Sequence, residues 1–260
     1  MTELPPLTWL YVPADRPDRI PKAIASGAHA VIVDLEDAVA PEAKPRARES
    51  LRDLLGEPAE IPVFVRVNAL DTPWGLADLD AVEALPGVGV IVPKVESAEL
   101  PSLGLHCLIE TPLGLERAFE IASARQVRGL SLGEADLGAA TGGSGAGLDW
   151  ARSRLINAAL AAGLPRPPQS VYLRIDDPDG LAASCAHGRE LGFLGRSAIH
   201  PRQLPVIERA YLPSAADVER ARGVVELGSG VLDGQFVDAP VVAAARTTLA
   251  LADRYGLADA

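Results

Sequence analysis

The sequence predicts an α/β fold of the (β/α)8, or TIM barrel, class with a C-terminal helical extension. The chain has 260 residues, which is about the length of one such barrel. Short β-type runs alternate with amphipathic helical stretches, as in a parallel sheet covered by helices. Eight such runs favour a closed sheet, and they span residues 9–12, 30–35, 63–67, 89–92, 105–109, 127–132, 170–173 and 193–199.

The helical stretches between these runs differ in strength. Residues 41–55 are amphipathic and rich in arginine, which predicts a helix. Residues 96–103 leave room for only a turn or two. After residues 201–211 we expect a charged helix over 215–227, a glycine-rich turn over 228–234 and a helix over about 239–255. These patterns predict a barrel over residues 1–202 and an extension over residues 203–260, available for oligomer contacts or for completing another subunit's site.

The composition argues against nucleic acid and membranes as partners. A net charge of -11 repels phosphate backbones and anionic lipid, so anionic ligands must be met by local arginines. Cys107 and Cys185 lack zinc-type spacing. The N-terminal residues do not resemble a signal peptide, and no apolar run approaches the roughly 18 residues that span a membrane. We expect a soluble, cytoplasmic protein.

Polar and charged residues follow most of the predicted strands, where a barrel enzyme carries its active site. Alone, each has a structural explanation as an ion pair or a helix N-cap. Together, the strand ends favour a site. The residues are Asp15, Arg16, Arg19, Asp34, Glu36, Asp37, Arg66, Asn68, Lys94, Glu96, Glu110, Glu134, Asp136 and His200.

Glu110 and Asp136 are the candidate metal ligands. Each follows an apolar run, and the two lie one βα unit apart. Carboxylates at the ends of neighbouring parallel strands converge, and Mg²⁺ prefers such hard oxygen ligands while retaining water for substrate. Glu36 and Asp37 would add negative charge that a divalent cation neutralises simply. We predict Mg²⁺, with Mn²⁺ as an alternative ion.

Arg66 is the candidate anion anchor, because a guanidinium binds a carboxylate through two nitrogens. Its structural alternative is to neutralise Glu110 or Glu36. Lys94 is disfavoured as a Schiff-base nucleophile, because nearby carboxylates would raise its pKa, and an ion-pair role is preferred. His200 is expected to form a structural hydrogen bond and not to bind zinc.

The glycine run over residues 142–147 has two interpretations. It predicts a mobile loop, or a lid at which the backbone approaches a ligand. A phosphate-binding P-loop is disfavoured, because no Gly-Lys-Ser or Gly-Lys-Thr follows and Asp149 stands where a cation is wanted.

Eight motifs occur in a characteristic order: YVPADRPDR at 11–19, VDLEDAV at 33–39 with Lys44 following, VRVN at 65–68, VPKVES at 92–97, IET at 109–111, LGEADL at 132–137, AIHPRQ at 198–203 and GQFVDAP at 234–240. They resemble the citrate lyase β-subunit-like family over residues 9–249. That family belongs to a wider set of magnesium-dependent barrel lyases with the malyl-CoA and citramalyl-CoA lyases and the hydroxy-keto-acid aldolases.

The resemblance implies roles for individual residues. Glu110 and Asp136 would bind Mg²⁺, and Arg66 would contact the carboxylate or developing enolate oxygen of a keto acid. In relatives, the residue matching Asp238 comes from the neighbouring subunit of a trimer or a pair of trimers and is proposed as acid or base. Its structural alternative is the N-cap of the last helix. Glu36 and Asp37 are further catalytic candidates, and Arg16, Arg19, Lys44 and Lys94 are candidates for holding substrate or CoA.

The implied reaction is carbon–carbon cleavage of a citryl, malyl or citramalyl thioester. Its products would be an acyl thioester and a keto acid such as oxaloacetate, glyoxylate or pyruvate. The chain is shorter than typical subunits of the full citrate lyase complex, so CoA and an acyl carrier protein both remain open as carriers. Two alternatives are a CoA-independent 2-keto acid aldolase and a non-catalytic subunit that binds an acyl ligand.

Overall fold

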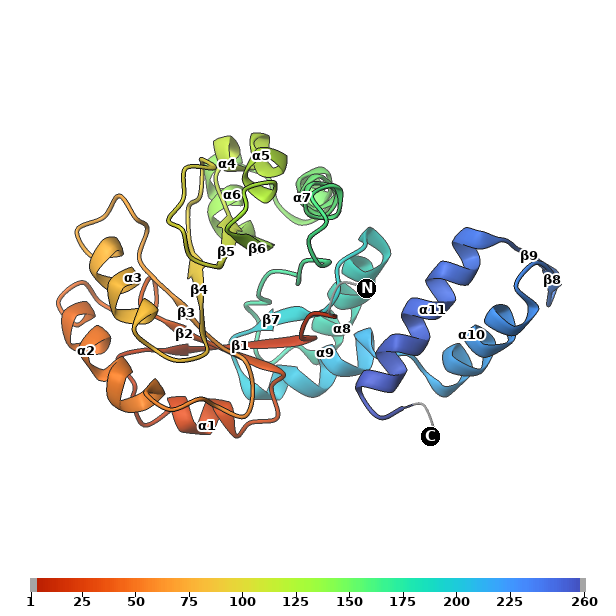
Figure 1. Ribbon diagram of the computed structural model, residues 1–260, viewed down its shortest axis with the longest axis horizontal. Coiled ribbons are helices and arrows are strands. Elements are labelled where there is room, and N and C mark those ends of the chain that lie inside the picture. Colours follow the sequence, from red (N-terminus) through yellow and green to blue (C-terminus); the bar gives the residue numbers. More distant parts are fainter. Residues whose placement is uncertain (1–3, 258–260) are drawn as a thin grey trace. The chain divides into compact units, whose positions relative to one another are not determined.

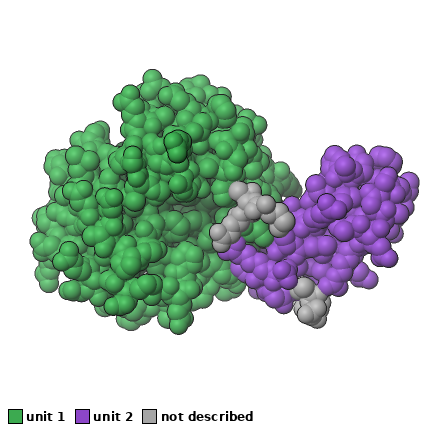
Figure 2. Space-filling view, viewed as in Figure 1, with its two compact units in different colours: residues 1–208 green, residues 209–260 purple. Residues whose placement is uncertain are grey.

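The computed structural model describes residues 4–257 and divides into two compact units (Figures 1 and 2). The first unit ends at Glu208, and the second begins at Arg209. The division falls inside helix α9 (Leu204–Tyr211), a few residues beyond the expected boundary at residue 202.

The first unit is built on one parallel sheet of seven strands in the order β6-β5-β4-β3-β2-β1-β7 (Figure 1). Its strands are β1 (Thr8–Pro13), β2 (Ala30–Asp34), β3 (Val63–Arg66), β4 (Val88–Val92), β5 (Leu105–Ile109), β6 (Val127–Leu132) and β7 (Arg196–Ala198). Pro13 is level with Asp34, and Asp34 with Arg66, across β1, β2 and β3. The carboxyl ends of these strands therefore form one rim.

The predicted strand over residues 170–173 does not form. Gln169 makes only an isolated parallel bridge with Arg196, in which its amide nitrogen donates to Gly195 O at 2.9 Å. On the other side the Ser170 hydroxyl donates to Leu132 O at the end of β6. Pro167 and Pro168 precede this segment and cannot donate a ladder hydrogen bond. Within the described residues, the ladder is an open, barrel-like sheet with an irregular segment between β6 and β7.

Helices connect most of the strands. They are α1 (Ile20–Ile24), α2 (Lys44–Leu55), α3 (Gly75–Glu83), α4 (Pro112–Glu116), α5 (Ala118–Ala122), α6 (Glu134–Thr141), α7 (Asp149–Ala161) and α8 (Pro178–Leu191). Residues 96–103 contain bends and no helix, so β4 and β5 are joined by a loop. The glycine run ends α6, with Gly142 at φ 73°, and continues into a 3-10 turn, η1 (Gly145–Leu148).

Alternate side chains of the strands pack into an apolar cluster that includes Trp9, Ile32 and Leu108. The Trp9 and Phe64 rings lie 4.9 Å apart between centroids. Period-two alternation explains this arrangement, because residues two apart on a strand share one face. The cluster supports the sheet beneath the charged rim.

The second unit is a helical hairpin with a small β-ribbon. It contains α10 (Ala215–Leu227), the antiparallel strands β8 (Gly230–Leu232) and β9 (Gln235–Val237), and α11 (Ala239–Arg254). A capping box between Ser214 and Asp217 begins α10, and Asp238 caps α11. Within residues 4–257, none of the helices has the length and apolar character needed to cross a membrane.

Replacing Gly195 by alanine should destabilise the first unit. Gly195 has φ +83°, and an added Cβ would lie 2.4 Å from Leu7 O. We expect about 1–2 kcal/mol from the left-handed backbone and a further cost of roughly 1–3 kcal/mol from the clash. Gly27→Ala is the matched control, because Gly27 has φ +85° and open space around the added atom. Urea unfolding followed by tryptophan fluorescence measures both, and equal losses would contradict the role of the close approach.

Candidate active site

A cavity of about 920 Å³ opens at the carboxyl ends of the strands in the first unit. Its wall includes Tyr11, Asp34, Asp37, Arg66, Glu110, Ser131, Asp136, Arg152, Tyr172 and Arg196. Gly143, Ser144 and Gly145 of the glycine run also line it. A smaller hollow of about 220 Å³ lies beside the starts of β3 and β4, away from these groups.

Glu110 and Asp136 come together in this cavity. Glu110 follows β5 directly and is 3 % exposed, and Asp136 lies in the first turn of α6. Burial, the charge of Glu36, and the charge and hydrogen bond of Asp136 raise the pKa of Glu110 to about 8. Gly133 makes room for this pair, since a Cβ there would lie 2.4 Å from Glu110 Oε2.

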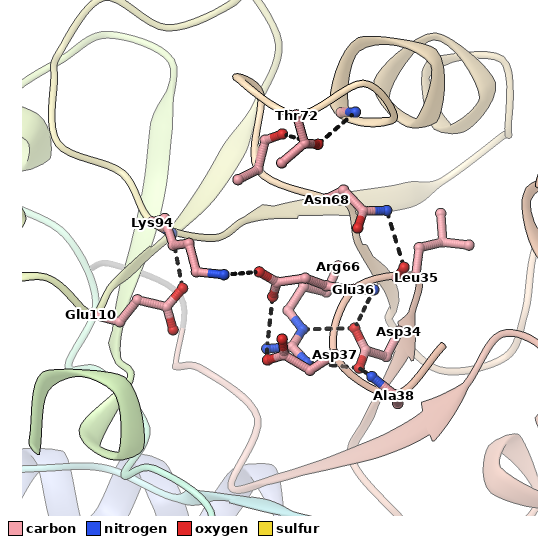
Figure 3. A network of polar contacts seen from close by, with 12 residues as sticks. Asp34, Leu35, Glu36, Asp37, Ala38, Arg66, Asn68, Thr72, Lys94 and Glu110 are labelled. Carbon is pink, nitrogen blue, oxygen red and sulfur yellow. Dashed lines mark hydrogen bonds and ion pairs between the residues drawn. The ribbon is translucent and has the colours of Figure 1, made fainter. Parts of the chain in front are cut away.

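Arg66 is held by a two-pronged ion pair with Asp34 (Figure 3). Arg66 Nε and Nη2 each lie 2.7 Å from an Asp34 carboxylate oxygen. Arg66 Nη1 lies 3.1 Å from Glu36 Oε2 and 3.3 Å from Asp37 Oδ2. Burial opposes the charge of Arg66, but the hydrogen bonds and charge of Asp34 outweigh it and raise the Arg66 pKa. Its principal partner is therefore Asp34, which the sequence does not indicate. The expected pairing with Glu36 is also present, whereas Glu110 forms no ion pair with Arg66.

Asp34 also orders the backbone that follows β2. Its carboxylate accepts hydrogen bonds from the amides of Glu36, at 3.0 Å, and Ala38, at 3.1 Å. Asp34 is almost fully buried, and its strand neighbour in the register is Arg66. One carboxylate thus fixes both the arginine and the loop that carries Glu36 and Asp37.

Lys94 connects two of the acidic residues (Figure 3). Its backbone amide donates to Glu110 Oε1 at 2.9 Å, and its Nζ donates to Glu36 Oε1 at 2.9 Å. The hydrogen bond to Glu36 is the largest cause of the raised Lys94 pKa, while burial raises the pKa of Glu36. The ammonium thus forms an ion pair and lacks the depressed pKa of a Schiff-base nucleophile.

Lys44 does not occupy the position expected for a residue that holds CoA. It is 5 % exposed, and its Nζ donates to the carbonyl oxygens of Leu35, at 2.8 Å, and Glu36, at 2.6 Å. Its ammonium also lies 5.4 Å from the Trp74 ring centroid. Lys44 begins α2 and folds back under the end of β2, so it supports the backbone of the site and is not available to a coenzyme.

Arg16 and Arg19 lie in the loop after β1 with exposed side chains, and Arg16 pairs with Asp18 at 3.3 Å. Asp238 belongs to the second unit, where its carboxylate accepts from the Val241 amide at 3.3 Å. Asp238 therefore serves as the N-cap of α11, its structural alternative, and its catalytic role stays a prediction. His200 accepts a hydrogen bond from the Arg202 amide at 3.1 Å, the structural role expected of it.

The cavity also contains residues to which the sequence assigned no role. Tyr11 lies under Arg66, whose guanidinium carbon is 5.1 Å from the ring centroid, and burial raises the Tyr11 pKa. Arg152, on α7, pairs with Glu134 and Asp149. Strand alternation places Tyr11 on the face of Trp9, a usable sequence signal. Arg152 and the buried Arg196 offer no comparable signal.

The pair Glu110 and Asp136 suits Mg²⁺ better than a metal that needs an all-protein cage. In the described part of the chain, no three His, Cys, Asp or Glu side chains form a ligating group. Mg²⁺ is commonly held by one or two carboxylates while substrate and water supply the other oxygens. Burial first, and then the charges of Glu36 and Asp136, raise the pKa of Glu110, and a divalent cation would stabilise its charged form.

Comparison with known proteins agrees with this geometry. The model of the HpcH/HpaI aldolase/citrate lyase family matches residues 7–100 and 99–201. A citrate lyase subunit beta-like protein of Mycobacterium tuberculosis is 40 % identical over 259 residues, covering 93 % of each chain. A (3S)-malyl-CoA thioesterase of Cereibacter sphaeroides is 35 % identical over 268 residues, covering 94 % of this chain and 93 % of the relative.

Solved structures of similar proteins contain the expected ligands. CitE of M. tuberculosis in complex with magnesium, acetoacetate and coenzyme A has a TM-score of 0.86 and 37 % identity, covering 97 % of this chain and all of that one. The citrate lyase beta subunit of M. tuberculosis with oxaloacetate and magnesium has a TM-score of 0.73 and 38 % identity, covering 80 % of this chain and 97 % of that one. From its motifs, its fold and these matches, the chain belongs to the HpcH/HpaI aldolase/citrate lyase family of enzymes.

Proposed function

We propose that this chain is a Mg²⁺-dependent carbon–carbon lyase that cleaves a β-hydroxyacyl thioester of the citryl, malyl or citramalyl type. The products are a keto acid, such as oxaloacetate, glyoxylate or pyruvate, and an acyl thioester. The observation that carries this proposal is the buried Glu110 beside the exposed Asp136, in one cavity with Arg66. Magnesium, oxaloacetate and coenzyme A in the similar structures support it.

Glu110 and Asp136 would hold the Mg²⁺, or Mn²⁺ in its place. Bound there, the ion would supply positive charge that stabilises negative charge on the keto-acid oxygen. Arg66 would bind the keto-acid carboxylate through Nη1, because Nε and Nη2 are held by Asp34. The keto acid would then share or replace the contacts that Nη1 makes with Glu36 and Asp37. Its ion pair with Asp34 keeps the guanidinium in place before substrate arrives, as effective positioning requires.

The reaction needs acid–base catalysis at two atoms, the hydroxyl oxygen and the α-carbon of the thioester. The hydroxyl proton must leave as the carbon–carbon bond breaks, and the α-carbon of the thioester must gain a proton. Asp238, supplied by a neighbouring subunit of a trimer or hexamer, would serve the α-carbon. Asp37 is the accessible candidate in the first unit, with a side chain 61 % exposed, whereas Glu36 is buried and bonded to Lys94.

Further expectations belong to the same proposal. Arg16 and Arg19 would contact the CoA or carrier-protein portion from the loop after β1. The segment that contains Gln169 and Ser170 would take the place of the remaining strand of the (β/α)8 barrel. Cys107 and Cys185 are free and buried, which fits a cytoplasmic location.

Two other functions use the same residues. A CoA-independent 2-keto acid aldolase would need Glu110, Asp136 and Arg66 but not Arg16, Arg19 or a thioester. A non-catalytic subunit would bind an acyl ligand without turnover. Release of keto acid from citryl-CoA, malyl-CoA or citramalyl-CoA in the presence of Mg²⁺ distinguishes the lyase from both alternatives, and inactivity with all of these esters while Mg²⁺ is bound would contradict the lyase.

Removing either carboxylate should weaken metal binding and abolish turnover. Glu110→Gln and Asp136→Asn are each expected to weaken Mg²⁺ binding by roughly 100-fold or more, because loss of a direct ligand exceeds the loss of an outer partner. Calorimetric titration of Mg²⁺ and keto-acid release measure the two effects. Glu116→Gln is the control, since Glu116 forms an exposed pair with Arg154. Full activity of both ligand variants would refute the metal assignment.

Magnesium affinity should depend on pH through Glu110. The pKa of Glu110 is raised from 4.5 to about 8, so below pH 8 the cation must displace a proton. We expect affinity to rise by about tenfold per pH unit between pH 6 and 8 and then to level off. A raised carboxyl pKa stabilises the metal-free fold below about 4.5, and this stability is lost as pH rises through about 8. Mg²⁺ should therefore raise the Tm more at pH 8.5 than at pH 6.

Calorimetry over this pH range tests the assignment, with Glu110→Gln as the comparison. The variant has no carboxyl group to titrate at this position, so any weak binding that remains should lose most of its pH dependence. A wild-type affinity that is constant from pH 6 to 9 would show that Glu110 does not ligate the ion.

Asp238 should matter only for the thioester reaction. Asp238→Asn is expected to lower lyase turnover by about 100-fold or more, within the range of acid–base catalysis, while leaving Mg²⁺ affinity unchanged. If the residue acts across subunits, mixing Asp238→Asn with Glu110→Gln protein, dissociated and reassembled, should restore part of the activity. Asp253→Asn, near the end of α11, serves as a control. Unchanged turnover in Asp238→Asn would favour the CoA-independent aldolase.

A further inference from the structure

Arg196 is a buried cation in the wall of the cavity. It begins β7, is 4 % exposed and lines the cavity together with Gln169, Tyr172 and Ser184. Its Nη1 donates to Gln169 Oε1 at 3.2 Å, Ser184 Oγ at 2.9 Å and Cys185 Sγ at 3.6 Å. All three acceptors are neutral.

A second nitrogen of the Arg196 guanidinium group, Nε, is buried and has no hydrogen-bond partner among the described residues. An unpaired buried donor is rare in folded proteins and calls for an explanation. Because Nη1 makes the three bonds, the edge formed by Nε and Nη2 is left for an acceptor. That edge is one of those through which guanidinium groups bind carboxylates and phosphates with two parallel hydrogen bonds.

The charge of Arg196 is also uncompensated. Arg66 and Arg48, the comparable arginines of the sheet region, pair with the buried carboxylates of Asp34 and Asp78. Within residues 4–257, no carboxylate lies within ion-pair distance of Arg196. The Tyr172 ring, whose centroid is 5.5 Å from the guanidinium carbon, offers a weak substitute for an anion. A buried charge without a partner is costly, and a bound anion would remove that cost.

Arg196 lies where the sheet is incomplete. Gln169 bridges to Arg196 in place of a full strand, and Ser170 reaches Leu132 on the other side. The cavity extends along this segment from the acidic residues at β5 and β6 to Tyr172, Ser184 and Arg196. The irregular backbone therefore leaves a place in the wall where a small ligand can meet the guanidinium.

We propose that Arg196 forms a second anion-binding position in this cavity, distinct from the magnesium pair and from Arg66. It takes a small oxyanion, a carboxylate or a phosphate group, on the Nε and Nη2 edge. Gln169, Ser184 and Cys185 hold the guanidinium through Nη1, and Tyr172 covers its face.

The test is calorimetric titration of inorganic phosphate into the metal-free protein at low ionic strength. Wild type should bind phosphate saturably, and Arg196→Gln should bind it at least about tenfold more weakly, because charge-assisted bonds are lost. Arg174→Gln is the matched control: Arg174 lines the same cavity but is 77 % exposed and pairs with Asp177. Its phosphate affinity should be unchanged.

Absence of saturable binding in wild type, or equal binding by Arg196→Gln, would overturn the proposal. If Arg196→Gln does not fold, crystals of the wild type soaked in selenate give an independent answer. Anomalous density for a selenate with one of its oxygens within hydrogen-bond distance of Arg196 Nε is expected. Selenate found only at Arg66 or at the surface would overturn the assignment. Neither experiment uses magnesium or turnover, so failure here is distinguishable from failure of the lyase proposal.

A competition arm identifies the source of the oxyanion. Phosphate is titrated again with Mg²⁺ and saturating oxaloacetate present. If oxaloacetate lowers the phosphate affinity of wild type but not that of Arg174→Gln, the competition depends on Arg174. That result would contradict the idea that phosphate and oxaloacetate share the position at Arg196. The same reduction in both proteins would support the position as one that receives a substrate carboxylate. Unchanged phosphate affinity in both would support a position for a separate anion.

Discussion

The ion pair between Arg66 and Asp34 is the interaction on which the rest of the site depends. The two residues are neighbours in the register of β2 and β3, so the sheet itself sets the pair. Both side chains are largely removed from water, and breaking a buried pair is far more costly than breaking an exposed one. With Nε and Nη2 fixed, Nη1 points to Glu36 and Asp37, and the acidic loop after β2 is held against the rim.

Charge balance then explains why a cation fits beside Glu110. Arg66 neutralises Asp34, and Lys94 neutralises Glu36. Among residues 4–257, neither Glu110 nor Asp136 has a basic side chain within ion-pair distance, and burial together with the neighbouring carboxylates raises the pKa of Glu110 to about 8. The nearby basic residues Arg66 and Lys94 are therefore used by the acidic residues at the end of β2 and in the loop that follows it. The structure leaves the pair closest to β5 and β6 to be balanced by a proton or by a metal ion.

Much of this site follows from the sequence, because parallel strands bring their carboxyl ends to one rim. Glu110, Asp136, Arg66 and Lys94 could be placed there from their positions after apolar runs. The partner of Arg66 could not, since choosing Asp34 over its neighbours requires the strand register. Lys44 was misplaced because its motif does not reveal that α2 begins by folding under Leu35. Each error arose where a side chain's direction depends on tertiary packing.

The sequence predicted most of the sheet, and the one strand that it predicted wrongly also depends on tertiary contacts. Six of the predicted strands, and part of the eighth, form where apolar runs have free backbone donors. The run over residues 170–173 has the right side chains, but prolines precede it and its neighbour β7 has only three residues to pair with. The periodicity of the side chains carries no information about backbone hydrogen-bond partners, so it could not distinguish this segment from a strand.

Lys94 links Glu110 to Glu36 through its backbone amide and its side-chain ammonium. It has φ 54°, a left-handed conformation that costs a non-glycine residue about 1–2 kcal/mol. Glycine would remove that strain and still direct the amide at Glu110, but it would lose the ammonium that holds Glu36. The strained lysine makes both bonds at once, which ties Glu110, the metal-binding candidate after β5, to the acidic loop after β2.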